Sequence, residues 1–240
     1  MAKKKSKNKK AKISLGRRIW RYTYRTALIL WLLSIAHVVM LKYVPVYFTP
    51  LMVLRSCQSI FDGKAPRNDK TWMPIELISH NLVVACVASE DNLFMKHNGF
   101  SERAIKQALS ERKEGKRMRG GSTISQQTAK NVFTFCSRTW FRKGVEAYYT
   151  VLIELIWGKK RIMEVYLNVV ELGDGIYGAE AASRHYWGIP ANKLTKAQSA
   201  LFAAALPNPR HYSITRPGPY MQKRKRQILD LMPKMGKIEF

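Results

Sequence analysis

The most hydrophobic part of the chain is an apolar segment near the N-terminus. The run TALILWLLSIAHVVML begins at Thr26 and contains no Asp, Glu, Lys or Arg. It is shorter than the roughly 20 residues that a spanning helix needs, but Lys42 can extend its amine to the interface, and the apolar YVPVYF follows. This pattern predicts one transmembrane helix at residues 26–44.

The residues on either side of this segment predict its topology and its end. Residues 1–25 contain eleven Lys or Arg and no Asp or Glu, so they are expected to stay in the cytoplasm. The chain would then be a single-pass protein of the cell inner (cytoplasmic) membrane, with the rest on the periplasmic, extracytoplasmic side. A cleaved signal peptide is the competing interpretation, but the leader is long and no small-x-small cleavage site follows. Pro45 and Pro50 predict an extended connector over residues 45–70.

Residues 71–240 are expected to form one folded domain, in which the hydrophobic spacing favours helices over strands. Ser or Thr precedes several amphipathic runs as an expected N-cap, and two of these starts have capping-box spacing. No internal repeat and no strand-turn-strand series is visible, so the predicted fold class is mainly α. The expected helices cover residues 81–90 after Ser79, 102–113 after Ser101, a run that begins after Thr123 with Gln126, then 140–157, 159–172 and 195–206 with Thr195 and Gln198.

The net charge of +26 indicates an anionic partner, such as nucleic acid, anionic lipid or a phosphorylated substrate. The chain shows no recognised reading helix or zinc finger, so no nucleic acid is expected. The KRKR run at 223–226 is interpreted as a solvated face or a contact with anionic lipid. The three cysteines have neither paired nor metal-like spacing and are interpreted as small buried hydrophobic residues: Cys57, Cys86 and Cys136.

Candidate chemistry begins with an acidic pair at the expected end of an apolar helix. Glu90 and Asp91 could be a solvated helix end, but a carboxylate beside apolar residues can also act as a general base. His97 follows in the next loop without a metal-like spacing around it, so it is expected to support the loop rather than bind a metal.

Two further segments could bind an anion. GGSTISQQTAKN, at 120–131, places two glycines before a helix N-terminus, where backbone N–H groups favour a negative charge, although an ordinary capped helix has the same pattern. In RKGVE, Arg142 and Glu146 project from one helix face. The default interpretation of these two residues is a surface ion pair. In the functional interpretation, Arg142 is a cation that binds a diphosphate.

These segments, in this order, resemble the glycosyltransferase family 51 enzymes, and the short layout is similar to the monofunctional biosynthetic peptidoglycan transglycosylases. The similarity extends through KKRIMEVYLNVVELGDGIYGAEAASRHYW and LTKAQSALFAAALPNP, and covers roughly residues 70–215. The resemblance implies a lysozyme-like, two-lobed glycosyltransferase domain that polymerises lipid II into β-1,4-linked glycan with inversion and loss of undecaprenyl diphosphate. No transpeptidase activity is expected.

The resemblance also implies roles for individual residues. Glu90 would deprotonate the acceptor sugar's 4-hydroxyl, Glu146 would be the second catalytic carboxylate, and Lys130 and Arg142 would neutralise the departing diphosphate. The other residues expected to shape the substrate sites are Asp91, Phe94, His97, Ser122, Thr123, Gln126, Gln127 and Asn131.

Partners and cofactors follow from the same resemblance. Lipid II and the growing glycan strand are the expected substrates, membrane lipids the surroundings, and proteins of cell-wall synthesis or division the candidate partners. The family's preference for a divalent cation, Mg or Mn, extends to this chain as an expectation. The sequence shows no dedicated ligand cluster, so no metal site and no required cofactor are expected.

Two other function classes remain open from the residues alone. Paired carboxylates in a helical cleft also serve a lysozyme-like hydrolase, in which water replaces the acceptor sugar. A membrane-tethered nucleic-acid-binding protein would use the positive charge. The anchor and the cationic segments favour the transferase over the hydrolase.

Overall fold

The computed structural model describes residues 15–101, 121–135 and 139–240, so the helix expected over 102–113 lies outside the described residues. The described chain is mostly helical, which confirms the predicted class. The helices are α1 (Leu15–Tyr43), α2 (Pro50–Phe61), α3 (His80–Glu90), α5 (Ile124–Phe133), α6 (Trp140–Ile156), α7 (Gly158–Val169), α8 (Ala179–Trp187), α9 (Lys196–Ala205) and α10 (Pro219–Leu231), with short 3-10 turns at Ile75–Leu77, Ala191–Lys193 and Met232–Met235.

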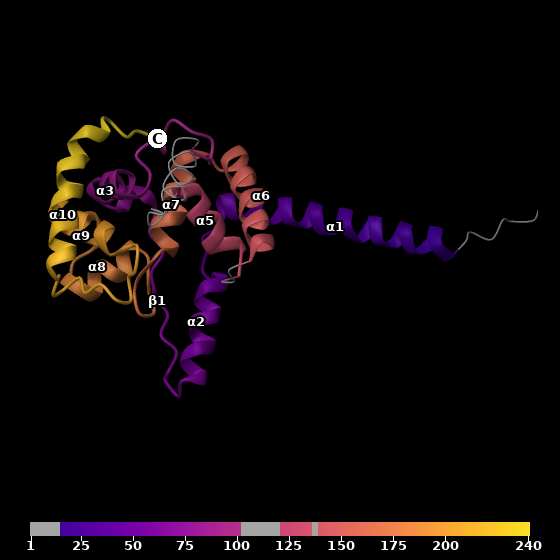
Figure 1. Cartoon of the computed structure of the whole chain (residues 1–240), viewed down its shortest axis with the longest axis horizontal. Helices are drawn as coiled ribbons and strands as arrows, with labels where there is room; N and C mark the ends of the chain where they lie inside the picture. The colour runs from indigo at the N-terminus through magenta and orange to yellow at the C-terminus, as the bar shows by residue number, and fades with distance from the viewer. Residues whose placement is uncertain (1–14, 102–120, 136–138) are drawn as a thin grey trace, which may run out of the picture.

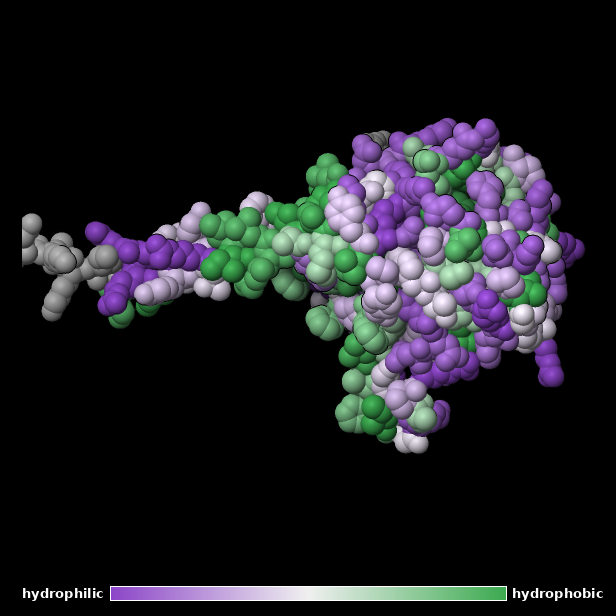
Figure 2. Space-filling model, turned by 180° about the vertical axis from the view of Figure 1, so that it is seen from behind, coloured by the Kyte–Doolittle hydropathy of each residue, from purple (hydrophilic) through white to green (hydrophobic). Residues whose placement is uncertain are grey.

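Helix α1 projects from the body of the molecule as a single rod, with its C-terminal end against the folded domain (Figure 1). It contains 29 residues and begins well before the predicted start at residue 26. At 1.5 Å per residue it is roughly 43 Å long, more than the hydrocarbon core of a bilayer. Its apolar side chains are mostly exposed (Figure 2). Within the described ranges it is the one helix long and apolar enough to cross a membrane.

The prediction of an extended connector over residues 45–70 is wrong, because α2 lies within it. Pro50 occupies the first turn of α2, where a proline costs no hydrogen bond and its fixed φ suits the helix. The Thr49 hydroxyl caps the same turn by accepting from Met52 N at 3.3 Å. The prediction of a buried Cys57 is also wrong, since this residue lies on the exposed face of α2. Cys86 is buried as predicted, and Cys136 lies outside the described residues.

The folded domain contains two groups of helices. Helices α3, α9 and α10 pack together on one side, while α5 packs between α6 and α7 on the side nearer α1 (Figure 1). Both capping boxes are formed, so those two helix starts are confirmed. Ser79 precedes α3 as predicted, but its hydroxyl donates to the carbonyl of Leu194 at 2.8 Å instead of capping the helix. That bond joins the start of α3 to the segment just before α9.

A small three-stranded sheet corrects the prediction that no strand-turn-strand element exists. The strands are β1 (Asp69–Lys70), β2 (Glu171–Gly173) and β3 (Ile176–Tyr177), in the order β1-β3-β2. The helix predicted to continue to residue 172 therefore ends at Val169. Asp174 and Gly175 form the turn, and Gly175 has a φ of +69°, which favours glycine.

Candidate active site

Glu90 is the last residue of α3, and neutral donors hold its carboxylate. Gln127, from the middle of α5, donates its side-chain amide to Glu90 Oε2 at 2.9 Å. The hydroxyl of Ser89 lies 3.2 Å from Glu90 Oε1 and 3.4 Å from the carbonyl of Ala203, so it can donate to either. Within the described residues, no Lys, Arg or His forms an ion pair with Glu90. Among the residues that the structure describes, its half-buried carboxylate is therefore positioned by neutral donors.

Two buried protic side chains lie close enough to Glu90 to feel its charge. Tyr166, on α7, directs its hydroxyl toward Gln127 Oε1 at a long 3.5 Å. Burial raises the pKa of the Tyr166 phenol well above its usual value, and the negative charge of Glu90 raises it further. Burial and the same charge also raise the pKa of the Cys86 thiol. Both groups stay protonated at neutral pH, so neither competes with Glu90 as a base.

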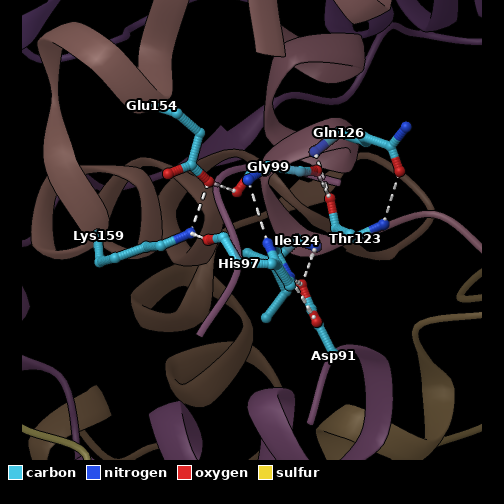
Figure 3. Close-up of polar contacts among 9 residues, drawn as sticks. Asp91, His97, Gly99, Thr123, Ile124, Gln126, Glu154 and Lys159 are labelled. Carbon is cyan, nitrogen blue, oxygen red and sulfur yellow. Dashed lines mark hydrogen bonds and ion pairs between the residues drawn. The ribbon is translucent and has the colours of Figure 1, made fainter. Parts of the chain in front are cut away.

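Asp91 has a different environment from Glu90, although the two are adjacent in the chain. Its buried carboxylate accepts from His97 Nε2, 2.9 Å from each oxygen, and from the backbone N–H of Ile124 at 3.0 Å. Figure 3 shows Asp91 reaching from the end of α3 to the first turn of α5. The N–H of Gly99 donates to His97 Nδ1 at 3.1 Å, so Nε2 is the nitrogen that carries the proton. Asp91 and His97 therefore fix the loop of residues 92–100 and the start of α5 beside Glu90.

The far end of this loop is fastened through Gly99. Its carbonyl accepts from the Thr123 hydroxyl at 2.6 Å, which joins the loop to the capping box of α5. Gly99 has a φ of +88°, and a Cβ at this position would lie 2.8 Å from Thr150 Cγ2 on α6. Only glycine suits both the backbone conformation and the close approach.

Lys159 and Glu154 fasten the middle of the same loop to α6 and α7. The Lys159 amine donates to the carbonyl of His97 at 2.6 Å and to Glu154 Oε1 at 2.7 Å (Figure 3). It also lies 4.7 Å from the ring centroid of Phe94, which is fully buried and meets His97 edge to face. Phe94 is therefore a packing residue of the loop in this structure.

Glu146 belongs to a second charged cluster, on α6. Its carboxylate is 2% exposed and is paired with Arg142 Nη1 at 2.6 Å and with the amine of Lys143. No described hydrogen bond or ion pair joins Glu146 to Glu90. The predicted pairing of Arg142 with Glu146 on one helix face is present, but the acid is buried and the pair is not simply a surface one.

The remaining predicted residues lie along α5 and just before it. Gln126 acts in the capping box, accepting from Thr123 N at 3.0 Å. Lys130 is exposed, Asn131 is buried and Ser122 is half-buried. The structure thus gathers one group around Glu90 and Gln127, a loop-fixing group around Asp91, and the separate cluster around Glu146.

Several residues of the site were missed at the sequence level. Ser89, Tyr166 and Lys143 lie within or beside recognised segments, and Lys143 has the three-residue spacing to Glu146 that indicates a helical ion pair. Arg224 was expected on a solvated or lipid-facing run, but it is half-buried and donates to the carbonyl of Ser89 at 3.1 Å. No local pattern indicates this contact, because its partners are 135 residues apart.

No group of three or more His, Cys, Asp or Glu residues that could hold a metal ion occurs among the described side chains.

The fold and the site together define a helical, lysozyme-like enzyme domain behind an N-terminal helix that is long and apolar enough to span a membrane. The family model described as "Transglycosylase" matches residues 58–233, which is most of the chain. The chain therefore belongs to the transglycosylase family, and the predictions of an enzyme and of this family are confirmed.

Curated relatives of nearly the same length are similar to the chain. A protein named biosynthetic peptidoglycan transglycosylase from Bacteroides thetaiotaomicron is 47% identical over 226 residues, covering 93% of this chain and 91% of that protein. Proteins of the same name from Bdellovibrio bacteriovorus and Pasteurella multocida are 47% and 42% identical, covering 88% and 98% of this chain and 84% and 96% of their own lengths.

Proposed function

We propose that this transglycosylase polymerises lipid II into β-1,4-linked peptidoglycan strands, with Glu90 as the general base. The observation that supports Glu90 is the difference between the three candidate carboxylates. Asp91 and Glu146 are buried and bound to His97 or to two cations, whereas Glu90 is half-buried and held by neutral donors. A base must keep a lone pair available for the incoming proton, and Glu90 satisfies this condition best.

The proposed reaction is a single displacement. Glu90 takes the proton from the 4-hydroxyl of the acceptor sugar, whose oxygen attacks the anomeric carbon at the reducing end of the growing strand. The new C–O bond forms with inversion as the bond to undecaprenyl diphosphate breaks, and the electron pair leaves with the diphosphate. When Glu90 is protonated, the Ser89 hydroxyl can turn to the carbonyl of Ala203, 3.4 Å away, without losing a partner.

Cations on α5 and α6 would stabilise the departing diphosphate. Lys130 is exposed, and Arg142 and Lys143 are partly exposed around the buried Glu146. In this proposal Glu146 is a positioning residue that holds the two cations rather than a second base. Fixed positive charges stabilise a leaving group most when they are already in place.

The proposed location is the inner membrane, with the catalytic domain outside the cytoplasm. The basic tail before α1 supports this orientation. Aromatic side chains at the start of α6 and just before it are exposed, namely Phe135, Trp140 and Phe141, at 76%, 89% and 83%. Because α6 packs against α1, these rings would lie near the membrane surface, where aromatic residues are favoured.

The proposed chemistry requires no cofactor. A divalent cation, Mg²⁺ or Mn²⁺, would act by binding the diphosphate of the substrate, because the charge of the leaving group develops there. Proteins of cell-wall synthesis or division are proposed partners, and no nucleic acid takes part.

Purified lipid II distinguishes the proposed function from glycan hydrolysis. The full chain in detergent should convert lipid II into glycan polymer and release undecaprenyl diphosphate, and it should leave preformed glycan intact. Cleavage of preformed glycan without any polymer would instead assign the site to a lysozyme-like hydrolase.

A further inference from the structure

We propose that α2 is an interfacial helix that lies in the headgroup layer of an anionic bilayer and fixes the orientation of the catalytic domain. This inference rests on the proposed membrane anchoring by α1. The partner is the lipid surface itself, and the site comprises one face of α2 and the basic cavity beside it.

Helix α2 exposes an apolar stripe at helical spacing. Val53, Cys57, Ile60 and Phe61 follow one another at intervals of four, three and one residues, and all are exposed, Phe61 by 90%. The opposite face contacts the domain through Met52, which is 2% exposed. An apolar stripe on a helix whose other face is already packed is typical of helices that lie at a membrane interface.

The short segment between α1 and α2 keeps α2 close to the membrane. Six residues separate Tyr43 from Pro50, a reach of about 20 Å when extended. The segment itself exposes Tyr47 and Phe48, aromatic residues of the kind that favour the interface. Helix α2 runs across the direction of α1 in Figure 1, as a helix in the membrane plane would. In Figure 2, hydrophobic surface on the projection formed by α2 faces the side from which α1 extends.

Contacts with the domain prevent this segment from acting as a loose tether. The amine of Lys70 donates to the carbonyls of Val46 and Tyr47, the latter at 3.1 Å. Arg161 donates to the carbonyl of Val44 at 2.6 Å. The position of α2 relative to the domain is therefore fixed.

The end of α1 is bound to the same domain. Arg161 donates to the carbonyl of Leu41 at 2.8 Å, and the indole of Trp157 donates to the carbonyl of Val38 at 2.8 Å. Because α1 and α2 are both bound to the same domain, their relative position is fixed. A bilayer that α1 crosses would therefore contact α2 at a defined depth.

A basic cavity of about 370 Å³ adjoins the stripe at Phe61. Its lining contains four cations, Arg55, Lys64, Arg67 and Arg210, and two acids, Asp62 and Asp174. Three of these cations form ion pairs, Arg55 with Glu171, Arg67 with Asp69 and Arg210 with Asp174, whereas Lys64 has no ion pair within the described residues. An unpaired cation beside an apolar stripe matches a layer in which lipid phosphates lie just outside the acyl chains. This charge complementarity is the reason for choosing an anionic bilayer as the partner.

The natural Cys57 permits a direct test in the full chain. In a Cys136→Ser variant, Cys57 is labelled with a fluorophore while Cys86 is buried, and the protein is reconstituted in phosphatidylcholine vesicles with about 30% phosphatidylglycerol. The control carries the fluorophore at Gln222→Cys, an exposed position on α10, in a variant that also has Cys57→Ser. Lipid with a spin label on its headgroup should quench the fluorophore at Cys57 about threefold or more strongly than the fluorophore of the control. Equal quenching at the two sites would overturn the proposal.

A third label separates this inference from the anchoring on which it rests. At Leu30→Cys, in the exposed middle of α1, the label should be quenched by lipid with a spin label deep in the acyl chain. If that label lies in lipid while Cys57 lies in water, the anchor stands and the interfacial helix is wrong. If both lie in water, both proposals fail. Equal quenching of the Cys57 label in pure phosphatidylcholine would overturn the preference for anionic lipid.

Discussion

Gln127 Nε2 lies 2.9 Å from Glu90 Oε2 and joins the end of α3 to the middle of α5. The same amide presents its oxygen to the Tyr166 hydroxyl, so its orientation is set from the other side. This contact connects two motifs that are 37 residues apart and holds the proposed base at one place in the site.

Gln127→Ala should lower kcat for lipid II polymerisation by about 10- to 100-fold, since a hydrogen bond to a charged acceptor contributes about 1.5–3 kcal/mol. KM should change much less, because the amide contacts the base rather than the substrate. Steady-state kinetics check this, with the exposed Gln222→Ala as a matched control. An unchanged kcat would show that Gln127 does not position Glu90.

Asp91→Asn should destabilise the fold by about 2–3 kcal/mol, because an amide cannot accept from both His97 and the Ile124 N–H without turning its NH₂ toward one of these donors. Chemical denaturation in detergent measures this loss. The equivalent acid-to-amide substitution, Glu90→Gln, should leave the unfolding midpoint nearly unchanged, since the groups that contact Glu90 are neutral and can reorient. Equal stability of the Asp91 variant and the wild type would contradict the loop-fixing role.

Arg142→Ala should raise the KM for lipid II about tenfold, because the proposed diphosphate site loses one of its cations. It also leaves the buried Glu146 with Lys143 alone. Arg184→Ala is the control, since Arg184 forms a similar four-residue ion pair with the buried Glu180 on α8. A similar rise in the control would indicate a general effect on the fold rather than on substrate binding.

Lys70 predicts a pH dependence of stability. Burial lowers the pKa of its amine from 10.5 to about 8 in the folded chain. Below pH 8 both states hold the proton, and the cost of burying the charge is fully present. Between about pH 8 and 10.5 the unfolded chain still binds a proton that the folded chain has released, so the free energy of unfolding rises with pH.

The measurement for Lys70 compares wild type with Lys70→Met, which cannot titrate. Relative to Lys70→Met, the free energy of unfolding of the wild type should rise by on the order of 1–2 kcal/mol across this window. The rise is limited to this size because Lys70 keeps some contact with solvent. A difference that stays constant with pH would contradict the lowered pKa.

The sequence predicted the elements that depend on local signals. The capping boxes at Thr123 and Thr195 and the long amphipathic helix α6 follow from spacings of three and four residues. The prediction of an extended connector from Pro45 and Pro50 is wrong because a proline is equally suited to the first turn of a helix, which is where Pro50 lies. The hairpin at Asp174 and Gly175 was missed because its strands are very short.

The candidate site was predictable as a set of residues but not as an arrangement. Glu90, Gln127 and Thr123 were all identified, yet only the folded chain shows that Gln127 touches Glu90 and that Thr123 binds Gly99. The opposite environments of Glu90 and Asp91 could not be read from adjacent positions. They arise because Glu90 stays partly exposed at the helix end, whereas Asp91 is buried against the start of α5.

The most direct test of the account compares wild type and Glu90→Gln on purified lipid II at equal protein concentration. Glutamine keeps the shape of the side chain but cannot take the proton, so polymerisation should fall by at least about 100-fold with an unchanged unfolding midpoint. Polymer formation at the wild-type rate by the folded Glu90→Gln protein would contradict the assignment of Glu90 as the base.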